Sequence, residues 1–145
     1  MERIVTSVST DYTEEAGHVY ASTLDPGIVT GLFGNLGSGK TQFVKGVCRY
    51  YDVKEIVNSP TFIIKNEYTG NDPVSGNEIY IHHFDLYRIS NINELTELGL
   101  NDIDVQNTIV IIEWAELAEE YFRGNINKIF FDYGIKENER IIKFT

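Results

Sequence analysis

The segment Gly34–Thr41 constrains the fold of this chain more than any other, and it reads G-N-L-G-S-G-K-T. Its spacing matches G-x-x-x-x-G-K-[ST], the pattern of a phosphate-binding loop. Gly34, Gly37 and Gly39 can adopt backbone angles that are closed to other residues, so successive amides can curl around an anionic oxygen. Such a loop joins a strand to the N-terminus of a helix, and the motif therefore predicts an α/β fold.

The residues on either side of the loop support this interpretation. The apolar run 28–33 is typical of a buried strand, and residues 42–51 carry apolar side chains at helical spacing. The dipole of that helix would attract an anionic phosphate at its N-terminus. We therefore expect a nucleotide to bind here, rather than a chance match in a glycine-rich turn. The expected contacts come from Gly34, Asn35, Leu36, Gly37, Ser38, Gly39, Lys40 and Thr41. Lys40 would reach the β- and γ-phosphates, and the Thr41 hydroxyl would hold Mg²⁺.

Composition limits the class of protein and its partners. A chain of 145 residues fits one domain, residues 1–145, with enough length to bury a core. Twelve basic residues against 22 acidic ones give a net charge of −10, which disfavours direct binding to nucleic acid. A single cysteine, Cys48, excludes an internal disulfide and favours a reducing compartment. With no apolar run of membrane-spanning length, we expect a soluble cytoplasmic protein that does not engage a membrane.

The remaining pattern predicts mostly alternating strands and helices. A helix over residues 10–24 would bury Tyr12, Ala16, Val19 or Tyr20, and Leu24. A hairpin is expected from residues 62–68 and 78–84, with its tip at residues 69–77. Further strands are expected at 3–8, 54–57, 108–114, 127–133 and 140–145, with helices at 91–98 and 115–122. The fold class is therefore α/β, with a parallel-cored sheet, antiparallel strands added at its edges, and helices on both faces.

Two carboxylates end predicted strands. Asp85 follows the strand 78–84, where α/β sheets present ligands, although it could instead cap the next helix. Glu113 follows the aliphatic run 109–112 and resembles a Walker B acid. A charge at the end of a buried strand is costly without a cationic partner, and Mg²⁺ would supply one. Ser59 and Thr61 flank Pro60 in an extended segment, where their hydroxyls could serve a site or merely a turn.

Several motifs together resemble the TsaE family, formerly YjeE, of small P-loop ATPases. They are T-E-E-A-G at 13–17, the loop at 34–41, N-S-P-T-F at 58–62, H-F-D-L-Y-R at 83–88, E-L-T-E-L-G-L at 94–100 and I-E-W at 112–114. The loop alone is shared by many NTPases, but the combination is far more specific. The sequence departs from the family pattern at Asn35, where Asp is common, and at Ala115, where Pro is usual. His82 precedes the motif histidine, and we interpret it as solvent-facing.

The resemblance implies an ATPase that acts in threonylcarbamoyladenosine modification of tRNA at position 37. It implies ATP and Mg²⁺ as cofactors, TsaD-like and TsaB-like proteins as partners, and contact with tRNA only through that complex. It assigns catalysis to Lys40, Asp85 and Glu113, and Mg²⁺ ligation to Thr41, Asp85 and Glu113. It also places Thr13, Thr61 and Trp114 near the nucleotide. The ATPase should be slow alone, because no second domain or arginine finger is evident. A small-molecule kinase and a nucleotide-gated interaction module remain alternatives.

Overall fold

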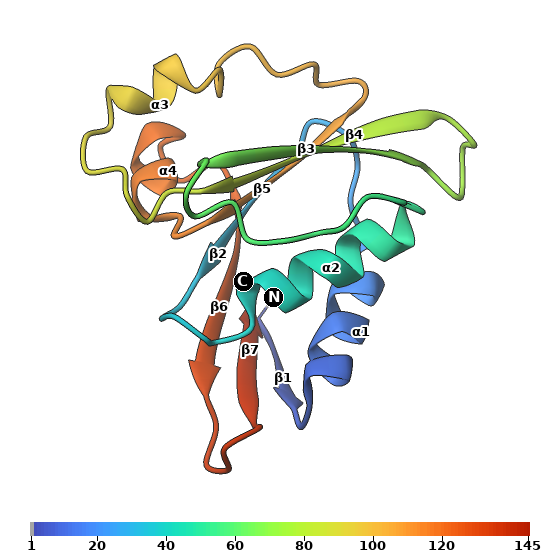
Figure 1. Ribbon diagram of the computed structural model, residues 1–145, viewed down its shortest axis with the longest axis vertical. Coiled ribbons are helices and arrows are strands. Elements are labelled where there is room, and N and C mark those ends of the chain that lie inside the picture. The colour runs from blue at the N-terminus through green and yellow to red at the C-terminus, as the bar shows by residue number, and fades with distance from the viewer. Residues whose placement is uncertain (1) are drawn as a thin grey trace.

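The computed structural model describes residues 2–145, in which seven strands form one mixed sheet with helices on both faces (Figure 1). In chain order the elements are β1 (Arg3–Ser7), α1 (Thr10–Ala21), β2 (Val29–Phe33), α2 (Lys40–Tyr50), β3 (Lys65–Asn71), β4 (Glu78–Asp85), α3 (Glu94–Glu97), β5 (Thr108–Glu113), α4 (Glu116–Tyr121), β6 (Asn127–Tyr133) and β7 (Arg140–Phe144). None of the helices within residues 2–145 is long and apolar enough to cross a bilayer.

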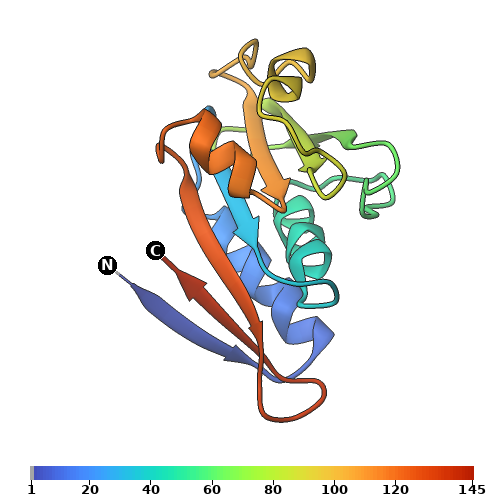
Figure 2. The same cartoon turned by 90° about the vertical axis from the view of Figure 1, so that its left-hand side faces the viewer.

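The strands lie in the order β1-β7-β6-β2-β5-β4-β3. The four central strands, β6, β2, β5 and β4, run parallel to one another. Antiparallel strands complete both edges, with β7 and β1 on one side and β3 on the other. Figure 2 shows β6, β7 and β1 side by side at one edge. The predicted fold class is confirmed, including the antiparallel pair formed by the last two strands.

Two hydrophobic cores sandwich the sheet. Ile109 and Ile111 of β5 point into the core under α1 and α2, while Val110 and Ile112 point into the core under α3 and α4. Each of these side chains is at most 1% exposed. The uninterrupted aliphatic run therefore reflects a strand buried on both faces, as the pattern predicted. Cys48 is also buried in the first core, as expected.

Helices α1 and α2 touch through their backbones (Figure 1). A Cβ atom at Gly46 would lie 1.8 Å from the carbonyl oxygen of Glu14, and one at Gly17 would lie 2.0 Å from that of Phe43. Only glycine permits this approach at either position. The contact holds α2 against α1, and so helps to place the N-terminus of α2 beside the carboxyl end of β2.

Four local predictions need correction. In α1, Tyr12 is 48% exposed because it lies on the outer face of the helix, whereas of the alternatives Val19 and Tyr20 it is Tyr20 that is buried. No strand forms at residues 54–57, where the Glu55 carboxylate instead accepts the N–H of Thr69 on β3. β3 begins at Lys65 and not at residue 62, because residues 60–63 form a turn. The third predicted helix shortens to Glu94–Glu97.

Candidate functional site

The segment Gly34–Gly39 runs from the end of β2 to the start of α2, in the order that the motif requires. Gly34, Gly37 and Gly39 have φ angles of 154°, 75° and 105°, in the left-handed region that favours glycine. In the part of the chain that the structure describes, the amides of Gly37, Gly39, Lys40 and Thr41 donate no hydrogen bond. These free donors at a helix N-terminus form a concave surface suited to an anion.

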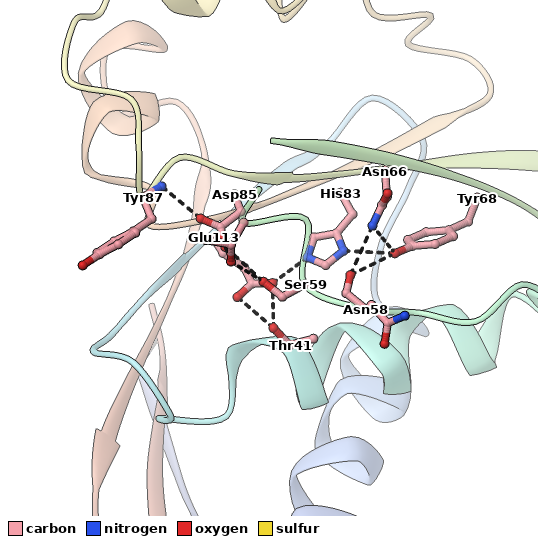
Figure 3. Close-up of polar contacts among 10 residues, drawn as sticks. Thr41, Asn58, Ser59, Asn66, Tyr68, His83, Asp85, Tyr87 and Glu113 are labelled. Carbon is pink, nitrogen blue, oxygen red and sulfur yellow. Dashed lines mark hydrogen bonds and ion pairs between the residues drawn. The ribbon is translucent and has the colours of Figure 1, made fainter. Parts of the chain in front are cut away.

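Thr41 and Glu113 meet at the mouth of the loop. The Thr41 hydroxyl lies 3.0 and 3.1 Å from the two carboxylate oxygens of Glu113 (Figure 3). Glu113 is paired in register with Asp85 on the neighbouring parallel strand, so both acids reach the same edge of the sheet. Both side chains are buried. The tertiary structure thus brings together the hydroxyl and the two carboxylates that the sequence assigned to one site.

The residues at this edge fit a hard divalent cation bound together with a triphosphate. Mg²⁺ prefers oxygen ligands and usually takes one or two carboxylates plus water and substrate phosphates. Thr41 and Glu113 provide such oxygens beside the free amides. The Ser38 hydroxyl, also on the loop, is buried without a hydrogen-bond partner in the described chain. Residues 2–145 contain no group of three His, Cys, Asp or Glu side chains placed to hold a metal alone. A cation here would therefore depend on the nucleotide.

Asp85 holds the segment that contains Ser59 and Thr61. Its Oδ2 accepts hydrogen bonds from the Ser59 hydroxyl at 3.1 Å and from the Thr61 hydroxyl at 2.8 Å. Its Oδ1 accepts the N–H of Tyr87 at 2.9 Å (Figure 3). The alternative role as a helix cap is not observed, because Asp85 closes a local turn and α3 begins only at Glu94. The carboxylate also anchors the Ser-Pro-Thr segment beside the loop, and its role as a ligand stays a prediction.

His83 begins the H-F-D-L-Y-R motif, but the sequence analysis gave it no individual role in the site. Its Nε2 lies 2.6 Å from Oε2 of Glu113, and its Nδ1 lies 3.4 Å from the Tyr68 hydroxyl. The side chain is completely buried. Glu113 thus already has hydrogen-bond partners in His83 and Thr41, so its burial does not by itself require a cation. The signal that could have found His83 was its position two residues before Asp85, on the same face of β4.

The Tyr68 end of this network reaches the Ser-Pro-Thr segment. The Asn66 side-chain amide donates both to the Asn58 carbonyl and to the Tyr68 hydroxyl, each at 3.2 Å. Asn58 directly precedes Ser59, which binds Asp85. Polar contacts therefore run without a gap from Thr41 on α2 to the residue before the Ser-Pro-Thr segment (Figure 3).

Lys40 packs against Trp114. Its Nζ lies 3.6 Å from the centroid of the indole ring and also donates to the Gly34 carbonyl. Burial lowers the pKa of Lys40, while the nearby charges of Glu113 and Asp85 oppose that shift. Trp114 itself adopts a positive φ of 55°, directly after β5. The ammonium group is thus held close to the loop by an aromatic ring.

A cavity of about 520 Å³ opens over this arrangement. Its walls include the loop residues from Leu36 onward, Thr61, Asp85, Glu113 and Trp114. The Arg88 guanidinium also lines it, 4.6 Å from the ring centroid of Phe62. A second cavity, of about 370 Å³, lies at the opposite end of β2 and contains no titratable side chain. The cavity above the loop, by contrast, is lined by Lys40, Asp85 and Glu113.

Thr13 lies on the other side of the loop from that cavity. A Cβ atom at Gly39 would be 3.3 Å from the Thr13 methyl group, and the Thr13 hydroxyl contacts that of Ser7 at 2.7 Å. The buried Thr13 lines a small hollow of about 80 Å³ together with Gly37 and Arg140. The structure therefore places Thr13 beside the loop, apart from the Thr41, Asp85 and Glu113 cluster.

Comparison with known proteins agrees with this geometry. The family model described as "Threonylcarbamoyl adenosine biosynthesis protein TsaE" matches residues 7–142. The chain is similar to the tRNA threonylcarbamoyladenosine biosynthesis protein TsaE of Bacillus subtilis, with 38% identity covering 96% of this chain and 82% of that protein. It is also 31% identical to the TsaE protein of Treponema pallidum, covering 76% of each chain.

A solved structure shows the same architecture. The crystal structure of YdiB from Bacillus subtilis superposes with a TM-score of 0.74 and 28% sequence identity, covering 99% of this chain and 84% of that one. The phosphate-binding loop, the two strand-end acids and the seven-stranded sheet thus occur together in a chain that matches a single family model almost throughout. This protein belongs to the TsaE family of threonylcarbamoyl adenosine biosynthesis proteins.

Proposed function

We propose that residues 1–145 act as one ATPase domain that binds ATP with Mg²⁺ in the Gly34–Thr41 loop and hydrolyses it slowly. The cycle would support threonylcarbamoyladenosine formation in tRNA by acting on a complex of TsaD-like and TsaB-like proteins. The observation that carries this proposal is the contact of the Thr41 hydroxyl with the Glu113 carboxylate beside free loop amides. Family membership supports the pathway.

Each residue of the site has a separate role in this proposal. The free loop amides and Lys40 bind the phosphate oxygens. To do so, Lys40 gives up its hydrogen bond to the Gly34 carbonyl and donates to phosphate instead. Thr41, Glu113 and Asp85 provide the oxygens for Mg²⁺ and for the water around it. A bound Mg²⁺ supplies the positive charge that neutralises the phosphates. Glu113 orients the attacking water, and the imidazole of His83 holds the carboxylate in place.

Electrostatics support a protein partner. The net charge of −10 disfavours direct contact with tRNA, so tRNA would be reached through the complex. Arg88 lines the cavity but stacks on the exposed Phe62 ring. An arginine supplied by a partner can raise the rate of such a site by about 10³- to 10⁵-fold. We therefore propose that a partner protein stimulates the ATPase.

Replacing Glu113 tests whether the protein turns over ATP. We expect Glu113→Gln to retain MgATP binding by calorimetry while losing phosphate release, because the amide cannot assist the attacking water. Glu120→Gln, on the exposed face of α4, is the matched control and should keep both properties. Undiminished phosphate release by Glu113→Gln would reject the proposed role. A wild-type protein that binds MgATP without releasing phosphate would favour the interaction module.

The pathway is tested separately. Depleting the protein in its host should lower threonylcarbamoyladenosine in bulk tRNA, measured by nucleoside mass spectrometry. Re-expression of the wild type should restore the nucleoside, and Glu113→Gln should not. Normal levels after depletion would remove the pathway assignment and leave the ATPase proposal intact.

A further inference from the structure

Two side chains from the last hairpin contact the phosphate-binding loop, about 100 residues away in sequence. The Tyr133 hydroxyl donates to the carbonyl of Leu36, and Nε of Arg140 donates to the carbonyl of Gly37 at 3.2 Å. Tyr133 and Arg140 are direct partners in the antiparallel β6–β7 register. The Arg140 guanidinium also lies 5.2 Å from the Tyr133 ring centroid, so the two side chains form one cross-strand unit.

The apex of the loop, residues 35–38, makes few other hydrogen bonds with the rest of the protein. Leu36 is 78% exposed, and a Cβ atom at Gly37 would meet nothing within 4 Å. Glycines in such a segment have wide conformational freedom. Within the apex, the Ser38 N–H closes a turn onto the Asn35 carbonyl at 3.1 Å. In the described chain, the hydrogen bonds that tie the apex carbonyls to another element come from Tyr133 and Arg140.

These contacts also set the direction of a backbone donor of the loop. A trans peptide is planar, so its N–H points opposite to its carbonyl. Because Tyr133 holds the Leu36 carbonyl, the N–H of Gly37 in the same peptide unit must point the other way. That N–H makes no hydrogen bond in the described chain, and Gly37 lines the cavity above the loop. An amide held ready in this way costs less entropy to order when an anion binds.

We propose that Tyr133 and Arg140 are positioning residues that pre-organise the phosphate-binding loop through the Leu36 and Gly37 carbonyls. The proposal rests on the proposed nucleotide site, because the anion that benefits is a nucleotide phosphate. Tyr133 contacts the loop through its hydroxyl and the backbone carbonyl of Leu36. Arg140 also holds the hairpin turn, since its guanidinium donates to the carbonyls of Glu137 and Glu139 at 2.8 and 2.9 Å.

Tyr133→Phe is the sharpest test, because it deletes one hydroxyl and keeps the ring under Arg140. Losing one hydrogen bond that holds the loop should weaken MgADP binding by about 3- to 10-fold in calorimetry. Tyr80→Phe is the matched control, since its hydroxyl contacts Glu78 on the same strand, away from the loop. MgADP affinity should be unchanged in Tyr80→Phe. Arg140→Gln should weaken binding in the same direction, with a thermal melt reporting any loss at the hairpin.

A second measurement needs no nucleotide. We expect ¹⁵N relaxation of the free protein to show increased motion of the Gly37 amide in Tyr133→Phe and wild-type behaviour in Tyr80→Phe. Unchanged MgADP affinity together with unchanged Gly37 relaxation in Tyr133→Phe would overturn the inference. An equal loss of affinity in both tyrosine variants would overturn it as well. If the wild type itself fails to bind MgADP, the proposed function fails, while the relaxation experiment still decides whether Tyr133 orders the loop.

Discussion

His83 and Glu113 form a buried hydrogen-bonded pair, with Nε2 of the imidazole 2.6 Å from Oε2 of the carboxylate. The histidine lies on β4 and the acid ends the neighbouring parallel strand β5. On its other side the same carboxylate meets the Thr41 hydroxyl at the start of α2. The pair therefore fixes the acid that faces the phosphate-binding loop.

Removing the imidazole should destabilise the protein through Glu113. In His83→Ala the carboxylate stays buried without its imidazole donor, and we expect a loss of about 3 kcal/mol in the free energy of unfolding. His83→Gln can still donate a hydrogen bond and should lose less. Urea unfolding of the nucleotide-free variants at neutral pH measures the difference. Equal losses in the two variants would indicate that packing, and not the hydrogen bond, accounts for the effect.

Trp114 should report occupation of the loop. It is the single tryptophan of the chain, and the Lys40 ammonium lies over its ring at 3.6 Å from the centroid. A phosphate that draws Lys40 away breaks this contact, so MgADP should change the fluorescence emission. Lys40→Met should show altered emission without nucleotide and no further response. A Lys40→Met protein that still responds like the wild type would disprove the link between the lysine and the signal.

The Thr61 hydroxyl should restrain the exposed segment that follows it. It donates to the buried Asp85 carboxylate at 2.8 Å, while Phe62 is 81% exposed. Thr61→Val removes this hydrogen bond, which contributes about 1 kcal/mol to holding the segment in place. Chymotrypsin should therefore cleave after Phe62 about 5-fold faster in this variant. Thr61→Ser keeps the hydroxyl and serves as the control. Identical cleavage rates for the valine and serine variants would show that the Asp85 contact does not restrain the segment.

Gly46 should be irreplaceable at the α1–α2 contact. Alanine favours a helix over glycine by about 1 kcal/mol. Its Cβ atom, however, would lie 1.8 Å from the Glu14 carbonyl oxygen, so the helices must separate. We expect the clash to dominate, with Gly46→Ala losing about 3 kcal/mol in the free energy of unfolding. Thermal denaturation measures this, with Lys45→Ala on the same helix as control. A stabilised Gly46→Ala protein would contradict the observed helix approach.

His82 should make stability depend on pH. Contrary to the expectation of a solvent-facing side chain, only 19% of it is exposed. Burial lowers its pKa, the Lys65 charge lowers it further, and Glu67 opposes the shift. The folded pKa thus lies below the unfolded value of about 6.5. The unfolded chain binds more protons, so this contribution is present above that value and is lost as the pH falls toward the folded pKa.

Comparison of variants isolates this contribution. We expect the free energy of unfolding of the wild type to fall from neutral pH to below 6, beyond the fall seen for His82→Gln. Urea unfolding of both proteins across this range gives the two slopes. Parallel slopes would show that His82 does not contribute.

Local sequence pattern was enough to predict the strands, loop and helix that carry the candidate site. The glycine spacing, the apolar run before it and the helical spacing after it depend only on neighbours in sequence, and each predicts the same strand, loop and helix. The aliphatic run before Glu113 likewise predicts a strand buried on both faces. The sequence pattern was weak at residues 54–57, and the strand predicted there was wrong. A strand at this place would need the N–H of Thr69 on β3 as a pairing partner, but the Glu55 carboxylate accepts that N–H instead.

The amino-acid sequence by itself determined the phosphate-binding loop, the parallel centre of the sheet and the two acids that end β4 and β5, because spacing along the chain encodes each of them. Only the tertiary structure decided that His83 supports Glu113 and that Tyr133 and Arg140 hold the Leu36 and Gly37 carbonyls. Those contacts join residues 30 to 103 positions apart. They depend on strand register and on the order of strands in the sheet, which no local pattern contains.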